Sequence, residues 1–203
     1  MTVTQARSII TNQTCVHDDL LKVLAKHKQN EFKRPVAEHT LAAFEEMLDW
    51  LADWRGDVIL DACCGVGEST INIANEYPAT KIIGIDKSLA RLDKHQSYVA
   101  KNESVNALSV NPAKYTKELA LTPAPNNYLL LQADLNDFWR LLLDYMLKQT
   151  PKWQITKQYI LYPNPYPKKS QLGKRWHGGA LFGTILGLCT HIEVRSNWRL
   201  YIE

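Results

Sequence analysis

The sequence predicts an α/β protein built on a mostly parallel sheet, and three observations carry this prediction. Apolar runs of strand length, such as residues 58–60, alternate with segments of helical spacing. A glycine turn, Gly65-Val66-Gly67, joins the first strand to a helix. An acid also ends three strands, at Asp61, Asp86 and Asp134. We expect these acids to lie at one edge of the sheet, where such folds bind ligands.

Residues 1–55 are predicted to form a basic N-terminal arm and a helical cover, ahead of a domain at 56–203. The arm is a solvated helix or binds phosphates, and its basic residues are Lys22, Lys26, Lys28, Lys33 and Arg34. Pro35 is expected to start the covering helix, since proline loses nothing at a first helical position. Gly56 ends it, and the residues spaced to face the core are Leu41, Phe44, Leu48 and Leu51.

The other elements follow from local signals. A helix over 67–77 stops at Pro78, a strand covers 81–85, and Ser88 caps a helix that runs to about Lys101. The long connection 102–127 is expected to hold a short helix at 114–119. Strands follow at 128–133, 158–162 and 191–195, with a helix at 136–148.

Composition excludes several classes of protein. With 203 residues, 45% of them hydrophobic and 22% charged, the chain has the make-up of a soluble globular domain. Its four cysteines have no C-x-x-C spacing, which argues against a zinc site or a disulfide framework, and no metal is expected. No run reaches the roughly 18 apolar residues of a membrane helix, so a cytoplasmic protein is expected. The oligomeric state stays open.

The glycine turn indicates the cofactor. A dinucleotide site would have a third glycine where this chain has Thr70, and Asp61 suits a cationic ligand. The turn resembles the first motif of the class I S-adenosylmethionine-dependent methyltransferases, with Cys63 in place of the motif's first glycine. Cys63 is therefore expected to have a less demanding backbone angle, or some crowding. The resemblance implies a Rossmann-like fold of strand order 3-2-1-4-5 with helices on both faces. The final strand pair of such methyltransferases is expected to be missing from this chain. The resemblance also implies S-adenosyl-L-methionine as cofactor, bound by Asp61, Cys64, Gly65, Gly67, Asp86, Lys87, Asp134 and Leu135.

The most specific stretch begins at Tyr162 and reads Tyr-Pro-Asn-Pro-Tyr-Pro-Lys-Lys. Its three prolines, at every second position, are expected to hold the backbone extended and rigid. It resembles the Pro-Asp-Pro-Trp-Pro-Lys signature of tRNA (guanine-N7)-methyltransferases, with Asn164 and Tyr166 in place of Asp and Trp. The resemblance implies methyl transfer to N7 of a guanine in tRNA, with Asn164 facing the base. The implied substrate-binding residues are Lys168, Lys169, Lys174, Arg175 and Asn197, the last where the family has Asp. The four basic residues suit RNA phosphates.

Two alternatives remain. Asn-Pro-Tyr is similar to the Asn-Pro-Pro-Tyr of exocyclic-amine methyltransferases, which would make this an N6-adenine enzyme; Asn164 can both donate and accept, as the adenine edge requires. The other alternative is a non-catalytic RNA-binding or partner subunit on the same fold. Cys63, Asn164 and Asn197 favour it, whereas the strand-end acids favour an enzyme.

Overall fold

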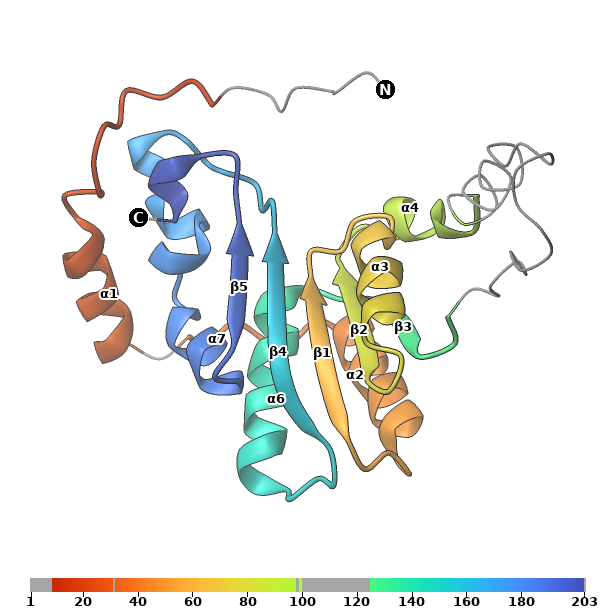
Figure 1. Cartoon of the computed structure of the whole chain (residues 1–203). Helices are drawn as coiled ribbons and strands as arrows, with labels where there is room; N and C mark the ends of the chain where they lie inside the picture. Colours follow the sequence, from red (N-terminus) through yellow and green to blue (C-terminus); the bar gives the residue numbers. More distant parts are fainter. Residues whose placement is uncertain (1–8, 31, 98, 100–124, 203) are drawn as a thin grey trace, which may run out of the picture.

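A computed structural model describes residues 9–30, 32–97, 99 and 125–202 of the chain. Its centre is a five-stranded sheet in which every pairing is parallel and the order is β3-β2-β1-β4-β5 (Figure 1). The predicted α/β class and strand order are therefore confirmed. The strands are β1 (Asp57–Ala62), β2 (Lys81–Asp86), β3 (Tyr128–Gln132), β4 (Gln154–Leu161) and β5 (Ile192–Arg195).

Helices cover both faces of the sheet. On one face α2 (Glu38–Leu51), α6 (Leu135–Lys148) and α7 (Phe182–Leu188) enclose the larger core, which includes Phe44, Met47, Phe138, Trp139 and Ile185. On the other face α3 (Glu68–Glu76) covers a smaller cluster around Ile59, Ile73 and Ile82 (Figure 1). This division agrees with right-handed crossovers, which set helices on opposite faces when the strand order reverses at β1.

The covering helix differs from its prediction. It begins at Glu38 rather than Pro35, because the Ala37 N–H donates to the Asp137 carboxylate (3.2 Å) and holds the preceding chain extended. Leu41, expected in the core, is 42% exposed. Thr40 is buried instead, where its hydroxyl accepts a hydrogen bond from the Asp134 N–H (3.0 Å).

The remaining described elements are α1 (Leu20–Gln29), α4 (Leu89–Leu92), η1 (Lys169–Lys174), η2 (Trp176–Gly178) and η3 (Arg199–Tyr201). Helix α4 ends at Leu92, but residues 95–97 and 99 are helical again after a turn at 93–94, so the helix expected from Ser88 onward is interrupted. Strand β4 begins four residues before its predicted start at 158. The short helix predicted at 114–119 lies outside the described residues. No described helix is long and apolar enough to cross a membrane. The division of the chain at residue 55 stays a prediction, and α2 shares its core with the sheet.

Candidate cofactor and substrate site

Backbone hydrogen bonds join the ends of three neighbouring strands. The Cys64 N–H donates to the Ile85 carbonyl (3.0 Å), and the Ala133 N–H donates to the Asp86 carbonyl (3.1 Å). The chain after β1, β2 and β3 therefore forms one continuous edge. Asp61, Asp86 and Asp134 all lie along it, although their carboxylates do not all face the same way.

Asp61 turns toward α3. Its Oδ2 accepts from the Ser69 and Thr70 hydroxyls (2.6 and 2.7 Å), and the residue is fully buried. Burial raises the pKa of this carboxyl and outweighs the two hydroxyl hydrogen bonds, which lower it. Its Oδ1 is also buried and has no hydrogen-bond partner among the described residues. A buried acceptor of this kind is costly unless a donor reaches it, so Oδ1 fits a ligand with a cationic or N–H group.

Cys63 has a left-handed backbone with φ of +65°, so the expectation of a less demanding angle is wrong. The residue follows the conformation that the glycine of the resembled motif would adopt without penalty. For a residue with a Cβ this conformation costs about 1–2 kcal/mol. The turn is therefore preserved despite the substitution, at the expense of local strain.

The two glycines of the turn are required for different reasons. Gly65 has φ of +63°, and a Cβ there would meet nothing within 4 Å, so its surroundings are open to a ligand. Gly67 has φ of +81°, and a Cβ there would lie 2.6 Å from His95 Nδ1 and 2.9 Å from Leu130. Gly65 thus leaves room at the site, whereas Gly67 permits close packing behind it.

Asp86 closes the turn from the neighbouring strand. It is 3% exposed, and its Oδ2 accepts from the Gly65 N–H (3.1 Å) and faces Arg91 Nη1 (3.4 Å). Its Oδ1 accepts from the Ser88 N–H (2.8 Å). Each oxygen can accept a further hydrogen bond, so Asp86 could still bind ribose hydroxyls. That role stays a prediction.

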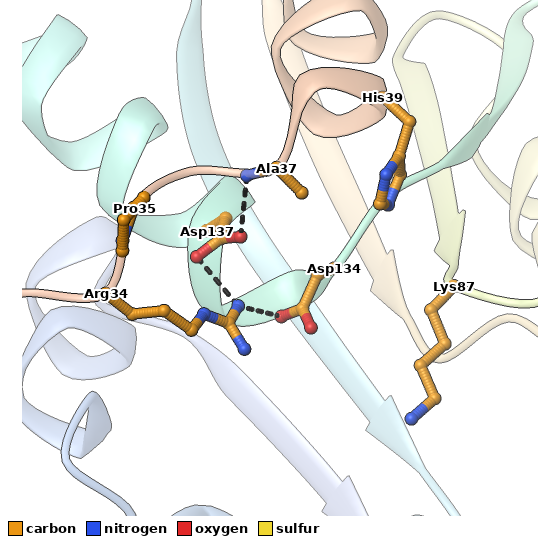
Figure 2. A pocket seen from close by; sticks show the side chains of 7 residues that line it. All are labelled: Arg34, Pro35, Ala37, His39, Lys87, Asp134 and Asp137. Atoms are coloured by element: carbon orange, nitrogen blue, oxygen red, sulfur yellow. Dashed lines mark hydrogen bonds and ion pairs between the residues drawn. The ribbon is translucent and has the colours of Figure 1, made fainter.

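A pocket of about 410 Å³ opens at the β3 end of this edge. It is lined by Arg34, Pro35, Ala37, His39, Lys87, Asp134 and Asp137, and Figure 2 shows Asp134 between Arg34 on one side and His39 and Lys87 on the other. Lys87 and Asp134 are both predicted cofactor residues, and the volume is typical of small-molecule sites. The pocket therefore lies between the chain after β2 and the chain after β3, on the same edge as the glycine turn.

Arg34 forms a clamp on this pocket that sequence reasoning missed. Its guanidinium pairs with Asp134 (3.0 Å) and with the buried Asp137 (2.8 Å) (Figure 2). Asp134 also caps α6 by accepting from the Asn136 N–H (2.9 Å). Burial raises the pKa of Asp134, but the hydrogen bonds from Arg34 and Asn136 lower it further, so the group stays below its ordinary range. No local signal in the sequence links Arg34 to an acid about 100 residues away.

Two other predicted cofactor residues at this edge are buried, and Cys63 beside them is half-buried. Leu135 and Cys64 are each 6% exposed, and both contribute to the apolar interior. Burial, and then the charges of Asp86 and Asp61, raises the pKa of Cys63 to about 12, so this thiol stays protonated at neutral pH. No three His, Cys, Asp or Glu side chains in the described ranges are grouped to hold a metal ion.

The loop after β4, residues 162–168, is called the proline loop below. It is not extended throughout as predicted, because Tyr162 and Tyr166, each preceding a proline, have left-handed φ angles of +50° and +46°. Such angles are rare for bulky residues and need support from their surroundings. The loop turns at both tyrosines, and Asn164 between them is exposed at the surface.

Support for the loop comes from residues 11–17, called the N-terminal strap. The Thr11 hydroxyl donates to the Pro167 carbonyl (3.0 Å), and His17 Nε2 lies 3.1 Å from the Lys169 carbonyl. Since a carbonyl can only accept, His17 carries its proton on Nε2, and its Nδ1 accepts from the Asp19 N–H (3.1 Å). The arm thus docks on the proline loop.

Arg175 links the same two segments, which corrects its predicted role. It was expected to contact phosphates, but it is 1% exposed. Its Nε donates to the Tyr166 carbonyl (3.1 Å), its Nη2 donates to Gln13 Oε1 (3.0 Å), and its guanidinium lies 4.7 Å from the Trp198 ring. Burial lowers its pKa. The other predicted substrate residues, Lys168, Lys169, Lys174 and Asn197, are exposed.

His95 is a second residue that sequence reasoning missed. Its Nδ1 lies 2.7 Å from the Val66 carbonyl and its Nε2 lies 2.9 Å from the Tyr128 hydroxyl. Nδ1 must donate to the carbonyl, so in the neutral ring Nε2 accepts from Tyr128. His95 therefore supports the glycine turn from behind. Only the packing against Gly67 reveals this, and the sequence holds no signal for it.

Comparison with known proteins agrees with this geometry. A family model described as "Putative methyltransferase" matches residues 55–181. A tRNA (guanine-N(7)-)-methyltransferase of Brugia malayi is 23% identical over 153 residues, which cover 71% of this chain and 51% of the relative. Ribosomal RNA small subunit methyltransferase B of Pasteurella multocida is 27% identical over 116 residues, covering 49% of this chain and 26% of the relative. The chain thus spans about half or less of the curated relatives it matches.

Among solved structures, coclaurine N-methyltransferase bound to N-methylheliamine and SAH aligns with 88% of this chain and 44% of its own. The TM-score is 0.35 and the sequence identity is 12%.

Proposed function

We propose that this chain, a member of the methyltransferase family whose model matches residues 55–181, methylates N7 of a guanine in tRNA. It is a divergent relative of the tRNA (guanine-N7)-methyltransferases. S-adenosyl-L-methionine is its cofactor. The observation that carries the proposal is the continuous edge of β1, β2 and β3, with the partnerless Asp61 Oδ1, the open space at Gly65 and the pocket at Asp134 along it.

The residues along this edge fit the cofactor. Asp61 Oδ1 would accept a hydrogen bond from its amino group, because this oxygen has no other donor among the described residues. Gly65 has no side chain, so the backbone of the turn would lie close to the cofactor there, and Asp86 would hydrogen-bond the ribose hydroxyls of the cofactor. Lys87 and Asp134 line the pocket that would take the base. When bound, the cofactor supplies an electrophilic methyl group on a positively charged sulfur.

The proline loop would hold the acceptor base. Guanine N7 carries a lone pair and no proton, so the chain needs to orient the base and exclude water rather than remove a proton. Asn164 is exposed on the loop and would hydrogen-bond the base edge. Lys168, Lys169 and Lys174 are exposed beside it and would contact backbone phosphates, together with Asn197.

A second candidate, N6-adenine methylation, rests on the same amide. Asn164 presents one donor and one acceptor, the pattern of the adenine edge, whereas a carboxylate only accepts. The variant Asn164→Asp separates the two readings. We expect it to raise transfer to guanine by about 5- to 150-fold, the equivalent of about 1–3 kcal/mol at one base edge. For an adenine enzyme the same change should lower transfer.

Two measurements test the proposal itself. Calorimetry with S-adenosylmethionine should show binding below about 1 mM, the upper end of ordinary substrate affinities. Incubation with labelled cofactor and bulk tRNA, followed by nucleoside digestion, should yield 7-methylguanosine. N6-methyladenosine would support the second candidate instead. No cofactor binding at this concentration would refute both and leave a non-catalytic RNA-binding or partner subunit.

A further inference from the structure

The N-terminal strap, which leads directly into α1, is held on the proline loop and η1 by contacts that span the chain. Thr11 and His17 in the N-terminal strap bond carbonyls of the Pro167–Lys169 region, and Gln13 bonds Arg175, at sequence separations of 152 to 162 residues. Helix α1 begins three residues after His17 and contacts η2 (Figure 1). The strap therefore determines where α1 lies.

Helix α1 contributes little to the core. None of its residues is buried, and its half-buried positions are Leu20, Val23, Leu24 and His27, which share one face at helical spacing. Lys22, Lys26 and Lys28 are all exposed. Helix α1 therefore has one weakly buried face, and three lysines are among the exposed residues on its other sides.

These lysines extend the basic surface of the proline loop. The exposed lysines of α1 and of residues 168–174 are Lys22, Lys26, Lys28, Lys168, Lys169 and Lys174, and the contacts of Asp18 with Lys169 and of α1 with η2 bring the two segments near each other. The acids within residues 18–30 and 168–175 are Asp18 and Asp19. Asp18 lies 3.4 Å from Lys169 Nζ, but both side chains are more than half exposed, so this pair neutralises little. The two segments therefore keep an excess of positive charge, and one of them directly follows the proline loop that carries Asn164.

We propose that α1 and the lysines at the end of the proline loop and in η1 form one surface that binds RNA backbone phosphates, and that the strap holds its two halves together. The proposal rests on the proposed function, in which RNA is the substrate. A polyanion fits because its charges repeat along a backbone, as the lysines repeat along α1 and the loop. Each phosphate neutralised by a lysine releases counterions, which makes binding depend steeply on salt.

The first test removes charge from α1. Binding of fluorescently labelled bulk tRNA is measured by anisotropy without S-adenosylmethionine, at several salt concentrations. The variant Lys22→Ala/Lys26→Ala should reduce the slope of log affinity against log salt by about 1.5, and the affinity at 0.1 M salt by about 30-fold. The control Lys148→Ala/Lys152→Ala removes the same charge at the opposite edge of the sheet, where α6 ends and β4 begins. It should leave the slope unchanged.

The second test removes no charge at all. In Thr11→Val/Gln13→Met the side chains keep their size but lose the hydrogen bonds to Pro167 and Arg175. If the strap positions α1, the salt slope should fall by about 1 although every lysine remains. Asn12→Ala, an exposed change in the same strap, is the matched control and should bind tRNA like the parent. Circular dichroism confirms that each variant is folded.

Three results would overturn the proposal. An unchanged slope in the α1 lysine variant would make α1 a solvated helix. An unchanged slope in the folded strap variant would remove the role of the strap. Poly-glutamate that competes with tRNA at equal charge concentration would assign the surface to acidic proteins. RNA binding as expected, without cofactor binding, would refute the proposed function alone.

Discussion

Replacing Cys63 by glycine tests whether the turn at the end of β1 is strained. Its φ of +65° lies in the left-handed region, which costs a residue with a Cβ about 1–2 kcal/mol. Glycine removes that cost. It also loses about 1 kcal/mol of side-chain burial and about 0.5–1 kcal/mol through the greater freedom of the unfolded chain. The gain and the two losses nearly cancel, so the free energy of unfolding of Cys63→Gly should lie within about 1 kcal/mol of the parent value.

The neighbouring thiol supplies the matched control. Cys64 is 6% exposed and is not among the residues with positive φ. The free energy of unfolding of Cys64→Gly should therefore fall by about 2 kcal/mol. This variant has the same two losses, of side-chain burial and through the freer unfolded chain, but relieves no backbone strain. A third variant, Cys63→Ala, keeps the strain and should be less stable than Cys63→Gly.

Urea unfolding followed by tryptophan fluorescence gives the comparison. With an m value of about 2.5 kcal/mol/M, the expected difference between the two glycine variants corresponds to midpoints about 0.5 M apart. Equal losses in Cys63→Gly and Cys64→Gly would refute the reasoning, because they would mean that the backbone at Cys63 stores no strain.

Three further predictions concern the same edge. In urea unfolding, Gly67→Ala should destabilise the fold by about 2–4 kcal/mol, because a Cβ there meets His95 and Leu130. Gly65→Ala should cost only about 1–2 kcal/mol, because a Cβ there meets open space. The reverse order of stability would contradict this packing. Asp86→Ala should weaken S-adenosylmethionine binding by about 1.5–3 kcal/mol in calorimetry, and an unchanged dissociation constant would remove Asp86 from the cofactor site. Arg34→Met should lower the free energy of unfolding at pH 7 by about 1.5–3 kcal/mol. Because the Arg34 pairing depresses the pKa of Asp134, this contribution is present above the unfolded value of about 4 and is lost as pH falls through the lower folded value, so the gap between variant and parent should shrink below about pH 4. A gap that persists there would show that Arg34 acts through packing.

Much of the sheet was predictable because its signals are local. The strand over 81–85 and the helix over 67–77 follow from apolar runs, glycine and proline that act on their immediate neighbours. The motif that suggested a cofactor also lies within one turn. At Cys63 the local rule left two outcomes open, a less demanding angle or crowding, and only the folded chain shows that its backbone is left-handed.

Burial and partnership were not predictable for residues with distant partners. Arg175 looked like a phosphate ligand because it follows a run of lysines, yet Gln13 and Trp198 enclose it. Arg34 looked like part of a solvated arm, yet it clamps Asp134. In both cases the partner lies far along the chain and has no pattern of its own.

Sequence alone determined the α/β class, the glycine turn and the positions of the strand-end acids, since each depends on spacing within about twenty residues. Tertiary structure decided which carboxylate serves a helix, which guanidinium is buried and which segment holds the proline loop. The reason is physical: hydrogen bonds between groups 100 or more residues apart form only once the sheet has brought them together, and their cost or benefit depends on the burial that the sheet creates.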